Sequence, residues 1–306
     1  MNLPKLEQPT SAIVFAYHEV GVRCLAVLLA HGVDVKMVIT HEDIPTEKIW
    51  FGSVADSARQ HGIFVAAPDN PHDGETLQRI RDIQPDFIFS FYYRKILKSS
   101  ILDTAKKGCY NMHGSLLPKY RGRVPVNWAI VNGESETGAT LHQMVPKVDA
   151  GPIVDQMAVP ILPNDTAQEV FNKVLVAAEI VLYRSLPSLV NGMAEHKAMD
   201  MTKASYFGGR NRDDGRIDWS QPAQQIHNLV RAVTHPYPGA FTETKLGLLA
   251  FWHTMLRPET SSGPPAMFTQ DGTLLARAGD GRILEILSVD LDGQSIKTVS
   301  EPLDLV

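Results

Sequence analysis

The first part of the chain alternates between short apolar runs and amphipathic segments, and this alternation restricts the fold more than any other feature. Apolar runs at 12–16, 33–40, 63–66 and 86–90 are each followed by a segment whose apolar residues recur with helical spacing. Strands that alternate with helices are typical of a parallel sheet, because parallel neighbours need a crossover connection that is usually helical. The pattern therefore predicts an α/β fold in which helices cover both faces of a mostly parallel, doubly wound sheet. The helices are expected at 20–31, 53–61, 75–83 and 101–107, with a further strand at 108–111.

From about residue 205 onward, short strand-like runs and one amphipathic helix replace the alternation, which indicates a small β-rich domain. A chain of 306 residues is long enough for two domains, and we expect them to cover 1–204 and 205–306. The segment 201–220 is rich in Gly, Arg, Asn and Asp, as linkers and binding loops are. Thr166 and Glu169 form a capping-box pattern that predicts the start of a long helix. The later elements are expected as strands at 140–145, 153–161, 248–252, 274–277 and 283–289 and as helices at 166–189 and 223–232.

The charge balance and the cysteines limit the class of protein. The formal net charge is −5 and no basic run stands out, which disfavours a nucleic-acid partner. Cys24 and Cys109 lie far apart and outside any CxxC pattern, as reduced thiols of a cytoplasmic protein do. The N-terminal residues lack the apolar run of a signal peptide, and no segment approaches the roughly 18 apolar residues of a membrane span. We therefore expect a cytoplasmic protein without membrane insertion, and no feature indicates its oligomeric state.

An amide, an imidazole and a carboxylate occur within about forty residues of the sequence, at Asn111, His113 and Asp149. They are spaced too widely for one helix face, so they meet only where the fold brings two loops together. Asn111 and His113 follow a predicted strand, and ligands of open parallel sheets bind beyond the carboxyl ends of strands. The combination suits acyl-type transfer, in which an amide stabilises an oxyanion, an imidazole moves a proton and a carboxylate orients the imidazole. The first strand-to-helix turn, at 16–21, lacks the GxGxxG pattern of a dinucleotide site.

Each of these residues also has an ordinary structural interpretation. A single histidine is more often structural than catalytic, and asparagine at a strand end commonly satisfies backbone groups. Asp149 lies in a turn-like sequence, where aspartate is frequent. Arg121 and Arg123 form part of a basic loop that is either solvated or a binder of carboxylate or phosphate. The histidines show no metal-ligand spacing, so we predict no metal.

With their neighbours, these residues resemble the signature of the 10-formyltetrahydrofolate-dependent formyltransferases. The resemblance rests on Asn111-x-His113-x-Ser-Leu-Leu-Pro, on an Arg-Gly-Arg-x-Pro run that begins at Arg121, and on the downstream Asp149. Segments at 16–18, 91–94, 205–208 and 226–233 are most similar to the branch that N-formylates UDP-4-amino-4-deoxy-L-arabinose, in lipid A modification and polymyxin resistance. Members of that branch are halves of bifunctional proteins that continue into a decarboxylating dehydrogenase, whereas this sequence stops at Val306. A free-standing enzyme would make other amino sugars possible acceptors.

The resemblance implies a Rossmann-like catalytic domain followed by an OB-like C-terminal subdomain. It implies His113 as the proton-transferring residue, Asn111 as the stabiliser of the transition state and Asp149 as the carboxylate that tunes the histidine. The formyl donor would be 10-formyltetrahydrofolate, and no metal would be needed. The family's folate contacts carry over to Lys95, Ile96, Leu97, Arg123, Val145, Pro146, Lys147, Val148 and Asp149.

The expected acceptor is a nucleotide-linked sugar, a small molecule that binds at the junction of the two domains. Its expected contacts are Tyr206, Arg210, Asn228 and Arg231, each of which has an alternative role in tying the domains together. Methionyl-tRNA formyltransferase shares the signature, but the acidic balance of this chain disfavours tRNA binding. A glycinamide ribonucleotide transformylase would lack the second domain, and a formyltetrahydrofolate hydrolase would need no amine acceptor. A non-enzymatic folate-binding module would not need Asn111, His113 and Asp149 together.

Overall fold

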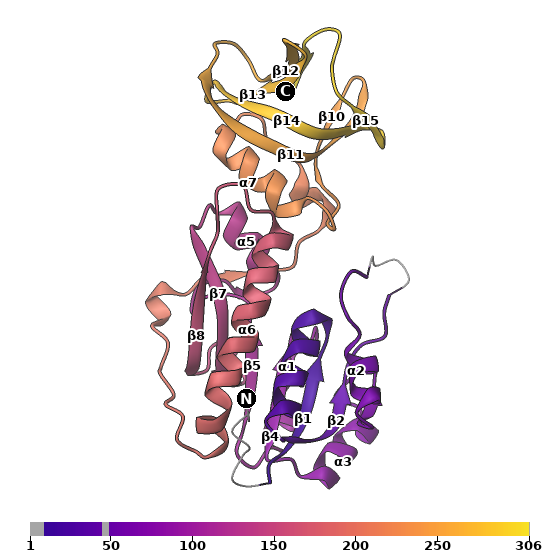
Figure 1. Ribbon diagram of the computed structural model, residues 1–306, viewed down its shortest axis with the longest axis vertical. Coiled ribbons are helices and arrows are strands. Elements are labelled where there is room, and N and C mark those ends of the chain that lie inside the picture. Colours follow the sequence, from indigo (N-terminus) through magenta and orange to yellow (C-terminus); the bar gives the residue numbers. More distant parts are fainter. Residues whose placement is uncertain (1–8, 45–48, 306) are drawn as a thin grey trace. The chain divides into compact units, whose positions relative to one another are not determined.

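The computed structural model describes residues 9–44 and 49–305, and the chain divides into two compact units. The first unit contains the residues up to 123 together with 137–159 and 172–207. The second unit contains 124–136, 160–171 and the chain from residue 208 onward. The segments 124–136 and 160–171 thus belong to the same unit as the C-terminal part of the chain. A single boundary between residues 204 and 205 does not place them there. Figure 1 shows the elements in the colours of the sequence.

The first unit is built on one seven-stranded sheet with the strand order β3-β2-β1-β4-β5-β7-β8. The strands from β3 to β5 in this order are parallel, whereas β5 and β7 are antiparallel. This confirms the prediction of a mostly parallel sheet. The strands are β1 (Ser11–Ala16), β2 (Asp34–Ile39), β3 (Phe64–Ala66), β4 (Phe87–Phe91), β5 (Gly108–His113), β7 (Glu136–Gln143) and β8 (Ile153–Pro160).

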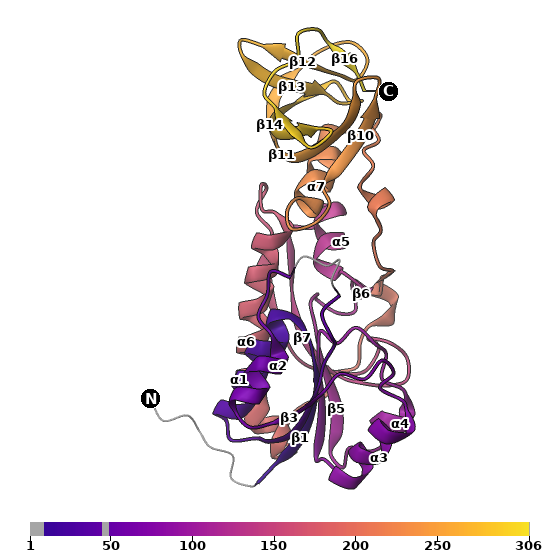
Figure 2. The ribbon, with the colours of Figure 1, turned by 90° about the vertical axis from the view of Figure 1, so that its right-hand side faces the viewer.

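Helices cover both faces of this sheet, as the alternation predicts. Figure 2 shows α1, α2 and α6 on one face and α3 and α4 on the other. The apolar residues between sheet and helices form the core, in which Phe15, Ile39 and Ile101 are fully buried. The helices are α1 (His18–Ala30), α2 (Val54–Gln60), α3 (Gly74–Ile83), α4 (Ser99–Leu102) and α6 (Ala167–Val190).

The sequence predicts most of these helices but is wrong about the end of one. The helix expected at 101–107 ends at Leu102, because the N–H groups of Lys106 and Lys107 donate to the carbonyls of Pro85 and Asp86 instead of to their own helix. The capping box that opens α6 is confirmed. The Thr166 N–H donates to Oε2 of Glu169 at 2.7 Å, and the Glu169 N–H faces Oγ1 of Thr166 at 3.4 Å.

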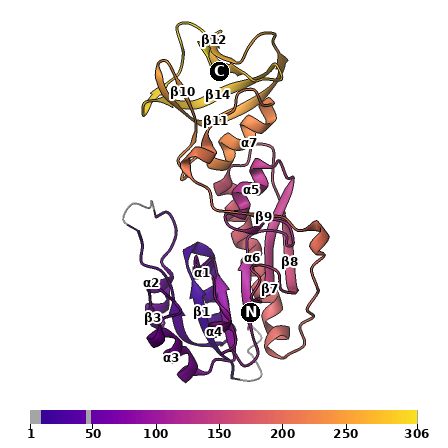
Figure 3. The same ribbon diagram turned by 180° about the vertical axis from the view of Figure 1, so that it is seen from behind.

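The second unit contains an antiparallel sheet of order β10-β11-β14-β13-β12-β16, with β15 paired to β14. Register shifts interrupt the pairing of β11 with β14, and such bulges bend a long strand so that its sheet curls (Figure 2). The β-rich, barrel-like C-terminal domain is therefore confirmed. Helix α5, which the sequence does not predict, packs beside α7 (Figure 3). The elements are α5 (Pro125–Val131), α7 (Ala223–Val233), β10 (Ala240–Thr244), β11 (Gly247–Thr260), β12 (Ala266–Gln270), β13 (Thr273–Arg277), β14 (Arg282–Leu291), β15 (Gln294–Ile296) and β16 (Leu303–Asp304).

Both cysteines are buried free thiols, Cys24 on α1 and Cys109 on β5. Burial raises the pKa of Cys109 to about 12, with a further contribution from the charge of Asp103. Thiols in this environment stay protonated and unreactive at neutral pH. In the part of the chain that the structure describes, no helix has both the length and the apolar character needed to cross a membrane.

Candidate active site

Strand β5 places Asn111 and His113 side by side on one face of the sheet, because side chains two residues apart in a strand point the same way. The strand lies between β4 and β7. Asn111 pairs with Ser90 of β4 and with His142 of β7. His113 is the last residue of β5 and pairs with Thr140. Both candidate residues are thus at the carboxyl end of a strand that runs parallel to β4, as predicted.

The ring of His113 is held between two oxygen acceptors. Its Nε2 lies 2.8 Å from the carbonyl oxygen of Tyr120, and its Nδ1 lies 3.7 Å from Oδ2 of Asp149. The first contact is a hydrogen bond, whereas the second is too long for one and acts through charge. Only the imidazolium form has an N–H for each acceptor. The side chain is 7% exposed, so the ring has little freedom to leave this position.

Asp149 is anchored by a short strand, β6 (Arg121–Gly122), which pairs in parallel with β9 (Tyr206–Phe207). The N–H of Gly122 donates to Oδ2 of Asp149 at 2.9 Å. The guanidinium of Arg121 donates to the carbonyl of Val148, with Nε at 3.2 Å. These two hydrogen bonds hold the loop before Asp149 and the carboxylate itself. Arg121 is therefore a buried structural support and not the solvated side chain of an open basic loop.

Gly122 is needed where β6 and β9 approach each other. Its φ is +97°, and a Cβ at this position would lie 2.2 Å from the carbonyl oxygen of Phe207. A side chain here would push β6 away from β9, and with it the N–H that holds Asp149.

Opposing effects set the charge of Asp149. Burial by itself raises the pKa of this carboxyl group. The charge of His113 and the hydrogen bond from the Gly122 N–H work against burial, and the pKa of the carboxyl group is held well below its ordinary value. Asp149 is thus a carboxylate at neutral pH.

His142 also belongs to this cluster, although sequence reasoning did not identify it. Its ring is 2% exposed, with Nε2 at 3.2 Å from Nδ2 of Asn111 and 3.5 Å from Oδ1 of Asp149. Its Nδ1 lies 3.0 Å from the carbonyl oxygen of Gln143. Nothing in the local sequence distinguishes His142 from the other histidines, because only the pairing of β5 with β7 places it opposite Asn111.

The first group of predicted folate contacts follows β4, and its three side chains have different environments. Nζ of Lys95 donates to the carbonyl of Pro68 at 3.2 Å and also to that of Asp69. The side chain of Ile96 is 63% exposed. Leu97 is buried in the core cluster that contains Phe15 and Ile101. Of the three, only Ile96 offers a large apolar surface to solvent.

The second group of predicted folate contacts is the loop Val145–Asp149 with Arg123. In this loop Pro146 and Lys147 are exposed, and Val145 and Val148 are partly buried. Met144, just before the loop, packs against the same core cluster as Leu97, so both groups border one apolar cluster. Arg123 has an exposed side chain, and its N–H donates to the carbonyl of Phe207 at 3.0 Å.

The four predicted sugar contacts are divided between the two units. Tyr206 belongs to the first unit and is 61% exposed. In the second unit, the Arg210 guanidinium lies 4.5 Å from the centre of the Trp128 ring and donates to the carbonyl of Asp214. Asn228 and Arg231 are buried on α7 and bonded to each other, with Nε of Arg231 at 3.0 Å from Oδ1 of Asn228. Their role in sugar binding stays a prediction.

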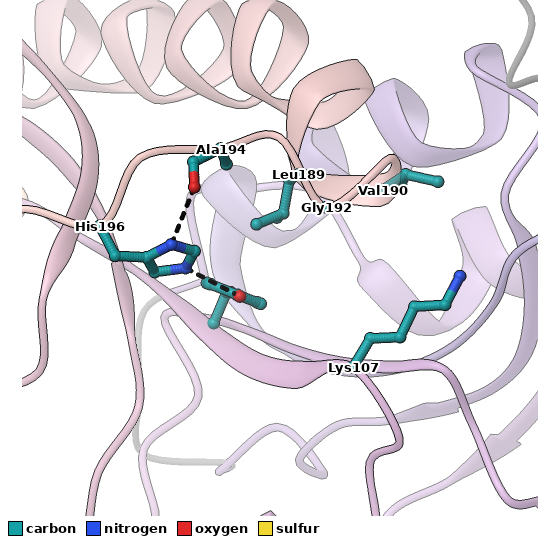
Figure 4. Close-up of a pocket in the computed structure, with 7 residues that line it drawn as sticks. Lys107, Leu189, Val190, Gly192, Ala194 and His196 are labelled. Carbon is teal, nitrogen blue, oxygen red and sulfur yellow. Dashed lines mark hydrogen bonds between the residues drawn. The ribbon is translucent and has the colours of Figure 1, made fainter.

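A cavity of about 320 Å³ lies in the first unit between the beginning of β5 and the end of α6 (Figure 4). The ring of His196 lines it and is bonded at 3.0 Å to the hydroxyl of Tyr110. Tyr110 points to the opposite face of β5 from Asn111, because neighbouring side chains in a strand alternate. The lining residues are Lys107, Tyr110, Leu189, Val190, Gly192, Ala194 and His196, and none of the predicted site residues is among them.

Metal ligation finds no support among the described residues, since residues 9–44 and 49–305 hold no group of three or more His, Cys, Asp or Glu side chains able to bind a metal ion. The side chains of the cluster are an amide, two imidazoles and a carboxylate. Groups of these types can donate hydrogen bonds to a developing oxyanion and move protons, which is what acyl transfer requires.

Comparison with known proteins gives matches over both units. Residues 26–186 match the family model described as "Formyl transferase", and residues 210–304 match "Formyl transferase, C-terminal domain". The N-formyltransferase of Helicobacter canadensis, solved with folinic acid and dTDP-3-aminofucose, is similar in fold. It is 22% identical, with a TM-score of 0.73 over 94% of this chain and 100% of the other.

Two further solved structures share the fold. WlaRD, a sugar 3N-formyltransferase solved in the presence of dTDP and 5-N-formyl-THF, is 20% identical, with a TM-score of 0.72 over 95% of this chain and 100% of the other. HypX of Aquifex aeolicus, solved in complex with tetrahydrofolic acid, is 15% identical, with a TM-score of 0.64 over 96% of this chain and 46% of the other.

Proposed function

Since the chain belongs to the formyl transferase family, we propose that it transfers a formyl group from 10-formyltetrahydrofolate to the amino group of a nucleotide-linked sugar. The observation that carries the proposal is the single cluster of Asn111, His113 and Asp149 at the end of β5. The amide, imidazole and carboxylate that acyl transfer needs are all within it.

In the proposed mechanism, the three side chains have separate tasks. The amide of Asn111 donates an N–H to the formyl oxygen as that oxygen gains negative charge. His113, as an imidazolium paired with Asp149, adds positive charge beside the same oxygen. It gives a proton to the folate nitrogen as the bond from that nitrogen to the formyl carbon breaks, and it takes up the proton that the attacking amine loses. Asp149, fixed by the Gly122 N–H, keeps the ring oriented. The acceptor's amino group attacks in its neutral form, because only that form has a free electron pair.

The residues around the cluster suit a folate as the donor. When bound, 10-formyltetrahydrofolate supplies a formyl group on a nitrogen that is a good leaving group. Ile96 offers an exposed apolar side chain for a flat ring, and the exposed guanidinium of Arg123 suits the carboxylates of a folate tail. The loop Val145–Asp149 is the third proposed element of this site, and no metal is part of the proposal.

The proposed acceptor is UDP-4-amino-4-deoxy-L-arabinose, and the proposed process is lipid A modification in polymyxin resistance. The similarity of segments 16–18, 91–94, 205–208 and 226–233 to that branch supports this choice. Similar folds solved with dTDP and dTDP-3-aminofucose support the coarser proposal of a nucleotide-linked amino sugar. Initiator tRNA is the less favoured acceptor, because a net charge of −5 is unsuited to a polyphosphate.

We further propose that residues 1–204 form the catalytic domain and 205–306 the C-terminal subdomain, in a cytoplasmic enzyme. Tyr206, Arg210, Asn228 and Arg231 stay the proposed contacts of the nucleotide sugar. The exposed Tyr206 ring is suited to stacking on a base, and arginines are suited to a diphosphate.

A product assay tests the proposal. The protein is incubated with 10-formyltetrahydrofolate and UDP-4-amino-4-deoxy-L-arabinose, and the mass of the acceptor is measured. We expect the gain of one formyl group, which the His113→Ala variant does not produce. Formylation of a different amino sugar would correct the acceptor, formylation of initiator tRNA would move the enzyme to another branch, and release of formate without any acceptor would identify a hydrolase.

A further inference from the structure

We propose that His142 is a positioning residue, which orients the amide of Asn111 for formyl transfer by accepting a hydrogen bond from it. This inference rests on the proposed function. The two residues face each other directly across β5 and β7, and the gap between Nδ2 of Asn111 and Nε2 of His142 is 3.2 Å. Because His142 is buried, its ring stays beside the amide.

The contacts of His142 define which of its nitrogens carries a proton. Nδ1 lies 3.0 Å from the carbonyl oxygen of Gln143, which only accepts, so Nδ1 carries the hydrogen. In the neutral ring Nε2 is then a bare acceptor, which matches the N–H of the Asn111 amide. The opposite amide orientation would place Oδ1 of Asn111 against the lone pair of Nε2, and the two would repel.

Asp149 offers Nε2 of His142 a competing contact, at 3.5 Å from Oδ1. That distance is beyond the usual range of N–H···O hydrogen bonds, and it is longer than the contact with Asn111. The carboxylate has other partners, since it accepts the Gly122 N–H at 2.9 Å and faces the ring of His113. The Asn111 amide is therefore the better partner of Nε2.

Orientation matters because an amide has two N–H groups on one side and an oxygen on the other. With one N–H of Asn111 bound to His142, the second remains for the formyl oxygen. Without His142 the amide can turn over and present its own oxygen to the developing negative charge. Misplacement of one catalytic group by about 1 Å can cost about 100-fold in rate, so we expect a loss of about 10- to 100-fold in kcat.

A double-mutant cycle separates positioning from a general structural role. The variants are His142→Leu, Asn111→Ala and the two combined, with His142→Gln as the conservative variant whose side-chain oxygen can still accept the Asn111 N–H. We expect His142→Leu to lower kcat with KM for the folate unchanged, and His142→Gln to stay within a few-fold of wild type. The combined variant should be no slower than Asn111→Ala, because His142 acts through the amide.

His196→Leu is the matched control. It removes a histidine of the same unit that is bonded to the neighbouring residue of β5, Tyr110, on the opposite face, and it should react at the wild-type rate. Equal losses for the leucine and glutamine variants of His142, or losses that add to that of Asn111→Ala, would overturn the inference.

Nitrogen NMR tests the same hydrogen bond without any activity. In ¹⁵N-labelled protein we expect Nδ1 of His142 to be protonated and Nε2 to be bare, with the Nε2 shift changing in Asn111→Ala. A protonated Nε2, or an Nε2 chemical shift that is the same in wild type and in Asn111→Ala, would overturn the inference. If the wild-type protein formylates no acceptor while this NMR result is obtained, the proposed function fails and the hydrogen bond stands.

Discussion

Oδ2 of Asp149 lies 3.7 Å from Nδ1 of His113, so the two side chains interact through charge without a direct hydrogen bond. Each partner is fixed by the backbone of one short segment. The Gly122 N–H holds the carboxylate, and the carbonyl of Tyr120 holds the other nitrogen of the ring. The backbone of the segment Tyr120–Gly122 therefore sets the geometry of the His113–Asp149 pair. Substitutions in this segment should affect the reaction, even though none of its side chains is proposed to contact the reacting groups.

Replacing His113 or Asn111 by alanine should abolish most turnover while leaving the fold intact. Loss of one donor to an oxyanion costs about 10²- to 10³-fold in kcat, and loss of a proton-transferring residue about 10²- to 10⁴-fold. Steady-state kinetics measures the effect, and circular dichroism with thermal unfolding checks the fold. A variant that keeps a near-wild-type rate would remove its residue from the mechanism.

The Asp149→Asn variant should change the pH dependence of the reaction as well as its rate. Asparagine can still accept the Gly122 N–H, but it removes the negative charge that lies 3.7 Å from Nδ1 of His113. The pH–rate profile should therefore differ from that of the wild-type protein. Profiles of kcat/KM for both proteins decide the matter, and an unmoved profile would show that Asp149 acts only as a structural group.

The same carboxylate should contribute to stability in a pH-dependent way. The pKa of Asp149 is lowered in the folded protein, so its contribution is present above the unfolded value of about 4 and is lost as the pH falls through the folded value. Urea unfolding between pH 7 and pH 3 should show the free-energy difference between wild type and Asp149→Asn shrinking with acid. A difference that stays constant over this range would contradict the assignment.

Gly122→Ala should lower the free energy of unfolding much more than a glycine-to-alanine substitution at another position with positive φ. Gly62 also has a positive φ, +70°, but open space around its Cβ position, so Gly62→Ala should cost about 1 kcal/mol. In Gly122→Ala the new Cβ meets the Phe207 carbonyl, and we expect a loss of about 3 kcal/mol or more together with slower formyl transfer. Equal unfolding free energies for the two variants would contradict the role of Gly122.

Arg231→Met tests the two roles that the sequence leaves open for this arginine. Its guanidinium bonds Asn228 and the carbonyl of Asp165, so its loss leaves buried acceptors unsatisfied and should cost about 2–4 kcal/mol of unfolding free energy. KM for the nucleotide sugar should rise as well, because Arg231 is one of its proposed contacts. Arg79→Met, at an exposed ion pair, is the control and should change stability by about 0.5 kcal/mol or less. An unchanged KM with the same loss of stability would limit Arg231 to a structural role.

The differences between expectation and structure follow from contacts over long sequence distances. Helix α5 was not predicted, and its seven residues, Pro125–Val131, pack beside α7, about a hundred residues later. The hydrogen bond from Asn127 to the carbonyl of Ala232 shows the same long-range packing. The segment 201–220, which composition indicates as a linker or binding loop, supplies β9, and only its pairing with β6 makes it a strand. Such short elements depend on partners that no local pattern reveals.

The sequence by itself determined the alternation of strands and helices in the first part of the chain and the position of Asn111 and His113 at a strand end, because apolar periodicity and strand length are local properties. It also indicated the chemistry, since an amide, an imidazole and a carboxylate stand in one recognisable signature. Only the tertiary structure decided which groups meet. The antiparallel pairing of β5 with β7 brings His142 to Asn111, 31 residues away, and β6 fixes Asp149 from 27 residues away. These contacts depend on register and chain closure, which are properties of the whole fold.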